Sequence, residues 1–466
     1  MLPFEKTGIK IPKILIPNQK VSLKKWAVIA CDQFTSQVDY WRDVERIVGA
    51  APSTLHIILP EVYLENDNLS EIIEQNNKVM VDYLRENVLE ELPEGLMLVE
   101  RQIGDRVRKG VMVAVDLEKY DFDPEAKAQI RATEKTVLER IPPRVQIRKG
   151  AILETPHIMV MMDDPENSAI GQLELHKTEL HKIYDFDLMK DGGNIKGYFT
   201  ENQVIIEKFK EAICNLNVHD GMMFCVGDGN HSLATAKTVW EEKKALLTPE
   251  EQEESPLRYA LVELVNARDE GIVFKPIHRI LFKVNPTTCL DYIVKRMNDK
   301  GLEARLIYSR FRYKSSSEVE CGGDIHVIPF VSKDGSGRIE VANSKDALAV
   351  SDLQDILDEF LAENPTSAID YIHGDDAFFE MATDYDNLGF FMGALDKSEF
   401  FETVINCGVL PKKTFSMGEA EEKRYYLECR YIGMKPLQQE EPQEQDAEQS
   451  VQEREEGIEN LERESD

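Results

Sequence analysis

Apolar and polar residues follow two different periods along this chain, and each period predicts a kind of element. Over 200–216 an apolar residue recurs every three or four positions, which predicts a helix. Thr200 and Gln203 match a capping box, in which each side chain satisfies the free N–H group of the other residue. The same period, with Ser70 as a capping residue, predicts a second long helix over 70–92.

Short apolar runs bounded by turn residues predict strands between these helices. The run VMVAV at 111–115 shows no clean alternation, so we expect this strand to be buried on both faces. Further strands are expected at 96–99, 157–162, 222–226, 259–265 and 277–282. After the strand at 222–226, a glycine-containing turn leads into a helical pattern over 232–247.

Helices and strands continue to alternate beyond residue 285, which favours a mixed α/β (α+β) protein. The expected elements are helices at 287–300 and 352–362 and strands at 304–308, 324–331 and 338–341. We therefore expect an N-terminal α/β domain over 1–284 and a smaller C-terminal α+β domain over 285–436.

The last thirty residues differ in composition from the rest. Residues 437–466 contain twelve acidic and two basic residues, few apolar residues and no aromatic residue. Such a segment buries too little apolar surface to offset the entropy of ordering, so we expect a disordered acidic tail. An acidic interaction arm is the alternative.

The charge and the cysteines narrow the class of protein. A net charge of −31 gives the protein no general electrostatic attraction to nucleic acid or to an anionic membrane. The seven cysteines form no CxxC pair, so neither a disulfide framework nor a zinc site is expected. The sequence shows no secretory signal and no apolar run long enough to span a bilayer, and we therefore expect a cytoplasmic protein. A homodimer is common enough to be a fair guess.

The turn Gly227-Asp228-Gly229-Asn230-His231-Ser232 is the first candidate site. A helix N-terminus presents free N–H groups and partial positive charge, so anions bind there readily. Asp228 could hold magnesium or orient a hydroxyl group, Gly229 permits a positive φ, and His231 and Ser232 could donate to phosphate oxygens. The alternative is that Asp228 or Asn230 simply caps the helix and His231 bonds locally.

A cluster of basic residues over 131–149 is the second candidate. This stretch holds six basic and two acidic residues within a strongly acidic chain. Arginine binds phosphate or carboxylate through a two-pronged guanidinium, and such a cluster would attract anionic ligands. Surface salt bridges to the many glutamates are the alternative. Glu134 and Glu154 could accept a hydroxyl proton, although for Glu154 an ion pair is the favoured interpretation. His278 and Arg279 could add a further anion contact.

Six segments together resemble the bacterial family catalogued as domain of unknown function 1015. They are IRATEKT (130–136), IPPRVQIRKGAILETPHIMVMMDDPE (141–166), YDFD (184–187), GDGNHSLATAK (227–237), KPIHRIL (275–281) and LPKKTFSM (410–417). The matches run from about residue 10 to 436, so the resemblance implies membership for nearly the whole chain before the acidic tail.

The turn also resembles the phosphate-binding turn of the ParB/sulfiredoxin-like fold, a group that includes nucleotide hydrolases and free-serine kinases. Many relatives carry Asp-Gly-His-His-Arg there; Asp228, Gly229 and His231 match that pattern, whereas Asn230 replaces a His and Ser232 replaces the Arg. The resemblance implies a ParB/sulfiredoxin-like strand–turn–helix in the N-terminal domain and a kinase-like use of nucleotide.

These observations lead to the hypothesis of a nucleotide-dependent phosphotransferase that acts on a small hydroxylated metabolite. ATP or ADP and magnesium are the expected cofactors. Glu134 is the candidate base, Asp228 would bind magnesium or orient the acceptor, and His231 would contact the transferred group. The residues expected to bind the phosphates or the nucleotide are Arg131, Thr133, Arg140, Arg144, Arg148, Gly229, Asn230 and Ser232. The alternative is a non-catalytic sensor that binds a nucleotide or an anionic metabolite, and a third possibility is a protein-interaction scaffold that uses the acidic tail.

Overall fold

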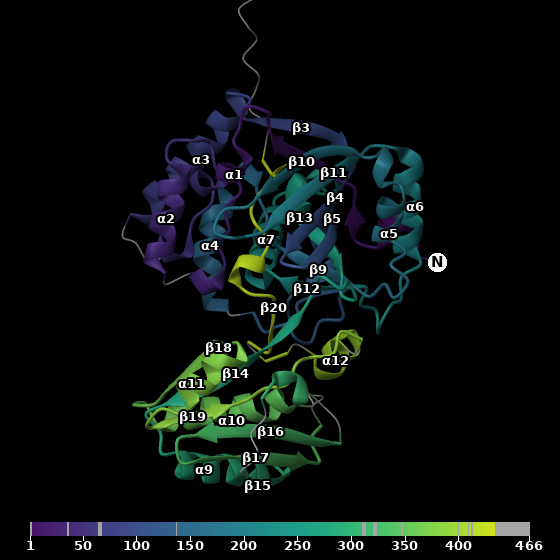
Figure 1. The fold of residues 1–466 in the computed structure, drawn as a ribbon. Coiled ribbons are helices and arrows are strands. Elements are labelled where there is room, and N and C mark those ends of the chain that lie inside the picture. The colour runs from purple at the N-terminus through teal and green to yellow at the C-terminus, as the bar shows by residue number, and fades with distance from the viewer. Residues whose placement is uncertain are drawn as a thin grey trace, which may run out of the picture.

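Two β-sheets with flanking helices organise the chain in the computed structural model (Figure 1). The structure describes residues 2–34, 37–63, 68–136, 138–309, 314–319, 324–345, 348–398, 400–408, 410–411 and 413–433. The predicted acidic tail, 437–466, lies outside these residues. The mixed α/β class that the sequence predicts is confirmed.

The larger sheet forms the centre of the N-terminal part. Within the described residues it has ten strands, in the order β10-β11-β4-β5-β13-β9-β12-β7-β6, and β1 pairs with β5. Its strands are β1 (Ile9–Lys10), β4 (Leu96–Ile103), β5 (Arg106–Asp116), β6 (Tyr120–Asp121), β7 (Ile130–Arg131), β9 (Met159–Met162), β10 (His181–Asp187), β11 (Asn194–Thr200), β12 (Phe224–Asp228) and β13 (Tyr259–Asn266).

Both faces of this sheet are covered. Helices α5 (Ile170–Leu175), α6 (Gln203–Cys214) and α7 (Asn230–Lys244) pack on one face. On the other face lie α1 (Leu23–Trp26), α2 (Val38–Val48) and α3 (Leu69–Arg85). Residues 111–115 of β5 are at most 2% exposed, because their side chains alternate between these two cores, and the predicted burial on both faces is confirmed.

The smaller sheet carries the second set of elements. Its order is β15-β17-β16-β19-β14-β18, with β20 paired to β14. The strands are β14 (Phe274–Phe282), β15 (Glu303–Ser309), β16 (Ile325–Ser332), β17 (Gly335–Ala342), β18 (Ala368–His373), β19 (Asn387–Phe390) and β20 (Phe415–Met417). Its helices are α9 (Pro286–Asp299), α10 (Ala349–Glu363), α11 (Asp375–Ala382) and α12 (Phe400–Cys407).

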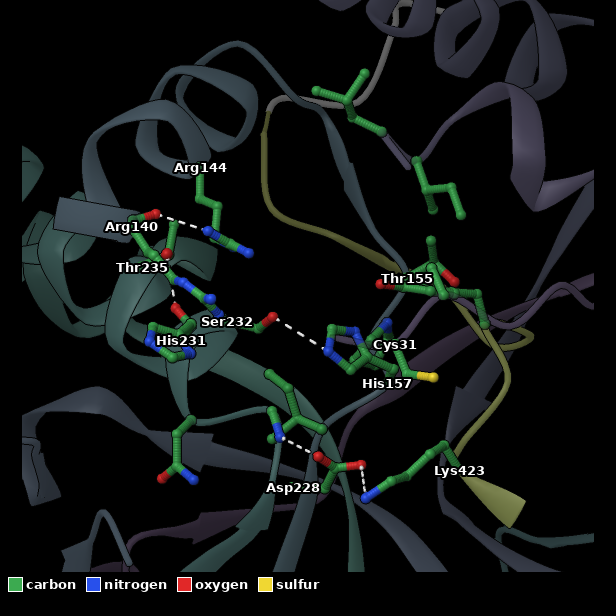
Figure 2. Close-up of a pocket in the computed structure, with 18 of the residues that line it drawn as sticks. Cys31, Arg140, Arg144, Thr155, His157, Asp228, His231, Ser232, Thr235 and Lys423 are labelled. Carbon is green, nitrogen blue, oxygen red and sulfur yellow. Dashed lines mark hydrogen bonds and ion pairs between the residues drawn. The ribbon is translucent and has the colours of Figure 1, made fainter. Parts of the chain in front are cut away.

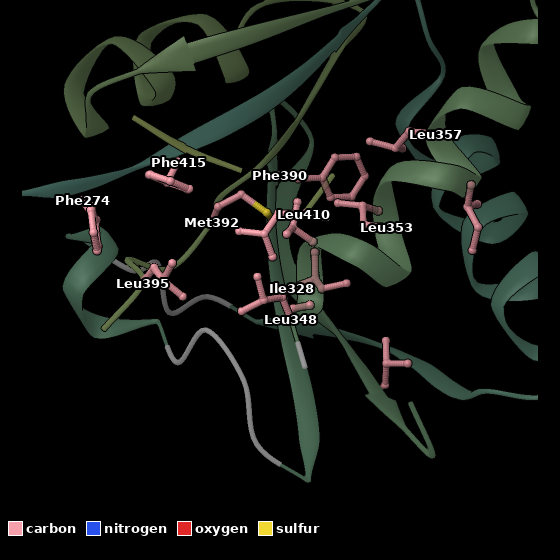
Figure 3. Packing of buried hydrophobic residues seen from close by; sticks show 14 of the residues in the cluster. Phe274, Ile328, Leu348, Leu353, Leu357, Phe390, Met392, Leu395, Leu410 and Phe415 are labelled. Atoms are coloured by element: carbon pink, nitrogen blue, oxygen red, sulfur yellow. The ribbon is translucent and has the colours of Figure 1, made fainter. Parts of the chain in front are cut away.

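The core of the smaller sheet continues into the larger one. Figure 3 shows Ile328, Leu353 and Phe390 packed together between the smaller sheet and α10. The same cluster includes Met159 and Met161 of β9. The expected boundary at residue 285 stays a prediction, but β14, which precedes it, belongs to the smaller sheet.

The segment 413–433 returns from the smaller sheet to the larger one. Trp26 donates its indole N–H to the Leu427 carbonyl oxygen at 2.8 Å. Two short pairs complete the strands: β2 (Lys13–Pro17) with β3 (Leu89–Glu94), and β8 (Leu153–Glu154) with β21 (Arg430–Tyr431). Within the described part of the chain, no helix is long and apolar enough to cross a membrane.

Two local predictions are wrong. The helix predicted over 70–92 ends at Arg85, because Asn87 adopts a positive φ of 53° and the chain then enters β3. The predicted capping box is absent as well. Asn202 caps α6 by accepting the Val204 N–H at 2.9 Å, and Thr200 accepts the Asn202 N–H instead.

Candidate functional site

A cavity of about 500 Å³ lies where the turn after β12, the helix α4 (Ile141–Lys149) and the segment 413–433 meet (Figure 2). A volume of this size is typical of small-molecule sites. The turn 227–232 and Arg140, Arg144 and Arg148 all line it. Two stretches about eighty residues apart in the sequence therefore form one site.

The turn exposes the N-terminus of α7 to the cavity. The register of β12 against β9 shifts between Val226 and Asp228, so Gly227 forms a bulge just before the turn, and Asp228 still pairs with Met159. Gly229 follows with a φ of +85° and is the residue before α7. No side chain caps this fifteen-residue helix, so the interpretation that Asp228 or Asn230 caps it is wrong. Asn230 Oδ1 is buried without a hydrogen-bond partner.

The arginines reach the cavity from one face of α4. Ile141 and Val145 pack against Ala234 and Val239 of α7 and so fix the rotation of α4 about its axis. Arg140, Arg144 and Arg148 follow at intervals of four residues, which places them on one side of the helix. Figure 2 shows Arg140 and Arg144 beside the start of α7, and Arg144 donates to the Arg140 carbonyl oxygen at 2.8 Å.

Arg148 is held by Glu154. Its guanidinium donates to Glu154 Oε2 at 2.6 Å, and Arg430 Nε donates to Glu154 Oε1 at 2.6 Å. Burial alone would raise the pKa of the Glu154 carboxyl group, but Arg430 and Arg148 outweigh it and lower the pKa. The interpretation of Glu154 as an ion-pair partner is confirmed.

Acidic and hydroxyl groups sit close to the turn. Asp228 Oδ1 accepts the Gly229 N–H at 3.1 Å, and its Oδ2 lies 3.5 Å from Lys423 Nζ. Ser232 Oγ lies 3.4 Å from His157 Nε2 (Figure 2). Glu134 and His231 also line the cavity.

The structure does not bring Arg131 or Thr133 to this cavity. Arg131 donates to the carbonyl oxygens of Ala128 and Asp220, at 2.9 and 2.5 Å, and so ties two loops together. Thr133 is fully buried and donates to the Val226 carbonyl oxygen at 2.6 Å, and this hydrogen bond holds the end of β12 just before the turn. Both residues therefore brace the backbone around the site.

His278 and Arg279, expected as a further anion contact, also lie away from the cavity, and that expectation is wrong. His278 is fully buried, faces Asp375 at 3.1 Å through Nε2, and accepts the Met392 N–H at Nδ1. Arg279 is fully buried against Gln354. Their neighbour Ile277 on β14 lines the cavity instead. His278 faces the other side of the strand because adjacent strand residues alternate, whereas Arg279 is bonded to Gln354 of α10.

Sequence reasoning missed several residues of the cavity wall. Lys413 lies in the segment LPKKTFSM, which resembles the family, but the resemblance alone does not place this lysine at the site. Lys423, His373 and Tyr426 carried none, since nothing local in the sequence places them near the turn. Part of the cavity wall is apolar. It consists of residues that the sequence alone does not distinguish from hydrophobic core residues, namely Ile57, Ile58, Met80, Ile147 and Leu153.

The cavity is positively charged although the chain is acidic. Among the described residues, six basic and three acidic side chains line it: Lys135, Arg140, Arg144, Arg148, Lys413, Lys423, Glu134, Glu154 and Asp228. The chain as a whole has a net charge of −31. A negatively charged ligand is therefore favoured here over the rest of the surface.

Comparison with known proteins gives a family and three distant structural similarities. A family model described as "Protein of unknown function (DUF1015)" matches residues 14–347. No curated protein matches the chain. A free serine kinase in complex with AMP is 14% identical, with a TM-score of 0.37, over 69% of this chain and 92% of its own.

Two further solved structures are similar at the same level. A conserved hypothetical protein from Pyrococcus furiosus is 13% identical over 68% of this chain and 90% of its own, with a TM-score of 0.33. SbnI with a C-terminal truncation, from Staphylococcus aureus, is 9% identical over 74% of this chain and 96% of its own, with a TM-score of 0.34. At these values, what the pocket does has to be inferred from its own residues.

Proposed function

Since the chain belongs to the family described as Protein of unknown function (DUF1015), we propose a function from its pocket: the transfer of a phosphoryl group from a nucleotide to a small hydroxylated molecule. The observation that supports it best is the uncapped N-terminus of α7 beside a row of arginines in one cavity. Backbone N–H groups, a helix dipole and guanidinium groups together suit the charge and shape of phosphate groups.

In this proposal the phosphates lie against the turn. The Gly229 backbone and the Ser232 side chain contact phosphate oxygens, and Asn230 accepts a hydrogen bond from the ligand through its buried, unpartnered Oδ1. Arg140 and Arg144 stabilise the charge that develops on the transferred group, and His231 contacts that group. Arg148 contributes less, because Glu154 already neutralises it.

The chemical step requires one base. The acceptor hydroxyl oxygen forms a bond to the terminal phosphorus, and the bond from that phosphorus to the bridging oxygen breaks. Glu134 takes the hydroxyl proton, and the bridging oxygen leaves with the shortened nucleotide. Asp228, held by Lys423 and the Gly229 N–H, orients the acceptor.

Magnesium fits this pocket only if the phosphates of the nucleotide supply most of its ligands. The described residues contain no group of three histidine, cysteine, aspartate or glutamate side chains placed to hold a metal ion. Mg²⁺ commonly binds one or two carboxylates together with substrate phosphates, and Asp228 is the carboxylate at the turn. Bound there, the ion would neutralise phosphate charge.

Arg144→Gln tests the proposal at the level of nucleotide binding. We expect ATP and ADP to bind about tenfold or more weakly, because a charge-assisted hydrogen bond to phosphate is lost. Lys149→Gln is the matched control, since Lys149 lies on the same helix but pairs with Glu242 and does not line the cavity. Failure of ATP and ADP to bind the unmodified chain in calorimetry, with and without magnesium, would refute the proposal.

Glu134→Gln separates an enzyme from a sensor in the same assay series. We expect turnover to fall by roughly 10²–10⁴-fold, the usual contribution of a general base, while nucleotide affinity changes by less than about twofold. Turnover is followed as phosphoryl transfer from ATP or ADP to a panel of small alcohols. Binding that persists without any turnover in the unmodified chain would favour the sensor.

A further inference from the structure

A serine and a histidine from different parts of the chain meet inside the cavity. Ser232 lies in the first turn of α7, and His157 lies just before β9. Both line the cavity, and Ser232 Oγ lies 3.4 Å from His157 Nε2 (Figure 2). A hydroxyl group within hydrogen-bond reach of an imidazole is the usual arrangement of an activated serine, and the contact is often longer before a ligand binds. The proposed function gives His157 no role.

The imidazole of His157 is held in place from two sides. Pro156 precedes it in the chain and has a fixed φ, which limits the path of the backbone. The His157 ring packs against the ring of Tyr426, with 5.0 Å between the ring centroids and 59° between the ring planes. Tyr426 in turn donates its backbone N–H to the Val28 carbonyl oxygen at 2.8 Å. The ring that faces Ser232 is therefore positioned by the segment 413–433.

A second hydroxyl group on α7 offers a contrast. Thr235 follows Ser232 by about one turn and also lines the cavity. Its Oγ1 donates to the His231 carbonyl oxygen at 2.7 Å, so this hydroxyl group serves its own helix. The Ser232 hydroxyl group instead meets an imidazole from another segment. Position on the helix alone does not create this pair.

Ser232 also lies where the proposed function places the phosphates. Figure 2 shows its side chain with Arg140 and Arg144 on one side and His157 on the other. In the proposed function these arginines contact the transferred group, and Ser232 contacts phosphate oxygens. The Ser232 oxygen is then next to the terminal phosphorus whenever the nucleotide is bound. A nucleophile, a base and a phosphoryl donor therefore share one cavity.

We propose that Ser232 itself accepts a phosphoryl group from the bound nucleotide when no other acceptor fills the cavity. Ser232 Oγ forms a bond to the terminal phosphorus, and the bond from that phosphorus to the bridging oxygen breaks. His157 Nε2 takes the hydroxyl proton, and the bridging oxygen leaves with the shortened nucleotide. This inference rests on the proposed function for the identity of the donor, but not for the Ser232–His157 pair.

The product of this step blocks its own site. A phosphoserine carries about 1.5 to 2 negative charges, and the first turn of a helix beside arginines stabilises such a group. The proposed function puts the nucleotide phosphates in the same place, so the modified chain repels them. Phosphorylation of Ser232 therefore switches nucleotide binding off.

Mass spectrometry of the full chain tests the proposal. The purified chain is incubated with ATP, and separately with ADP, in the presence of magnesium and without any alcohol. We expect the intact mass to rise by one phosphoryl group, and fragmentation to place that group on Ser232. The modified chain should then bind fresh ADP about tenfold or more weakly in calorimetry, because like charges at close range repel strongly.

Three variants test the roles of the two residues. Ser232→Ala should abolish the mass increase, whereas Thr235→Val, the matched control on the same helix, should keep it. His157→Gln should slow the mass increase by roughly 10²–10⁴-fold, the usual contribution of a general base. The thermal midpoint of unfolding shows whether each variant folds. Fragmentation of the unmodified sequence locates the phosphate even if Ser232→Ala does not fold.

The outcomes separate this proposal from the proposed function. A chain that binds ATP or ADP but gains no phosphoryl group, or gains it on a residue other than Ser232, would overturn this proposal and leave the proposed function standing. An unchanged rate in His157→Gln would overturn the role of the pair. Acetyl phosphate is a small donor without a nucleoside. Phosphorylation of Ser232 by acetyl phosphate, in a chain that binds neither ATP nor ADP, would support the pair and refute the nucleotide proposal.

Discussion

Gly229 is the residue on which the shape of the turn depends. Its φ of +85° lies in the left-handed region, which residues with a Cβ atom rarely adopt. An added Cβ would also lie 3.0 Å from Ile158 Cγ1 and 3.1 Å from its Cα atom. Ile158, the residue before β9, would therefore have to move by a few tenths of an ångström to admit a side chain at the point where the chain turns into α7.

Gly229→Ala should lower the free energy of unfolding by more than the ~1–2 kcal/mol that the left-handed conformation alone costs. Gly104→Ala is the matched control, because Gly104 has a φ of +57° but no atom within 4 Å of an added Cβ. Urea unfolding measures both variants. Equal destabilisation would show that Ile158 yields to the new methyl group. ADP affinity should fall for Gly229→Ala only.

At the scale of elements, His278 connects β14 with the start of α11 and with the chain after β19. Nδ1 accepts the Met392 N–H at 3.0 Å, and Nε2 faces Asp375 Oδ1 at 3.1 Å. Burial lowers the pKa of His278 to about 4, although Asp375 opposes the shift. A proton added to Nδ1 would turn this atom into a donor that faces the Met392 N–H, which is also a donor. The hydrogen bond to Met392 therefore requires the neutral imidazole.

This arrangement predicts a pH dependence of stability. The unfolded chain binds a proton at His278 below about pH 6.5, whereas the folded chain binds it only near pH 4. Acidification through this window therefore favours unfolding, by roughly 3 kcal/mol in total if the full shift is realised. Urea unfolding of the protein at pH 7 and pH 5 measures the effect. His278→Asn keeps an acceptor but cannot titrate, and an unchanged pH slope in this variant would contradict the assignment.

The elements also show what the sequence could and could not predict. Arg144 and Arg148 lie on α4 and Arg140 is the residue before it, so their spacing alone puts the three on a common side, and the basic cluster points to the cavity. Arg131 belongs to the same cluster but precedes α4 on β7, where it bonds to loop carbonyls. His373 reaches the cavity through the pairing of β18 with β14, and Lys423 reaches the turn through the return of the segment 413–433, and no local pattern encodes either contact.

At the scale of the whole molecule, the segment 413–433 holds the two sheets and the cavity together. Arg424 is almost fully buried and lies 2.8 Å from the buried carboxylate of Glu263 in β13. It also pairs with Glu428, whose carboxylate accepts the Tyr184 hydroxyl group at 2.5 Å. Removal of one partner from a buried ion pair is strongly destabilising, by about 3–5 kcal/mol.

A chain that ends at Pro411 should therefore lose folded structure in the larger sheet, although every strand of that sheet remains. Trp26 loses its partner Leu427, so its fluorescence emission should shift to longer wavelength, and ADP binding should disappear. The control chain ends at Gly433 and should keep both properties. Unchanged emission and thermal midpoint in the shorter chain would contradict the role given to the segment 413–433.

Because the segment 413–433 returns to the larger sheet, the protein can form its complete ligand pocket only late in its synthesis. The turn at Gly229 and the arginines of α4 leave the ribosome long before Lys413 and Lys423 do. The cavity stays without its last wall until translation has passed residue 433, so every shorter nascent chain or prematurely terminated product lacks a complete pocket. Ligand binding thus reports on a chain that has been translated through this closing segment.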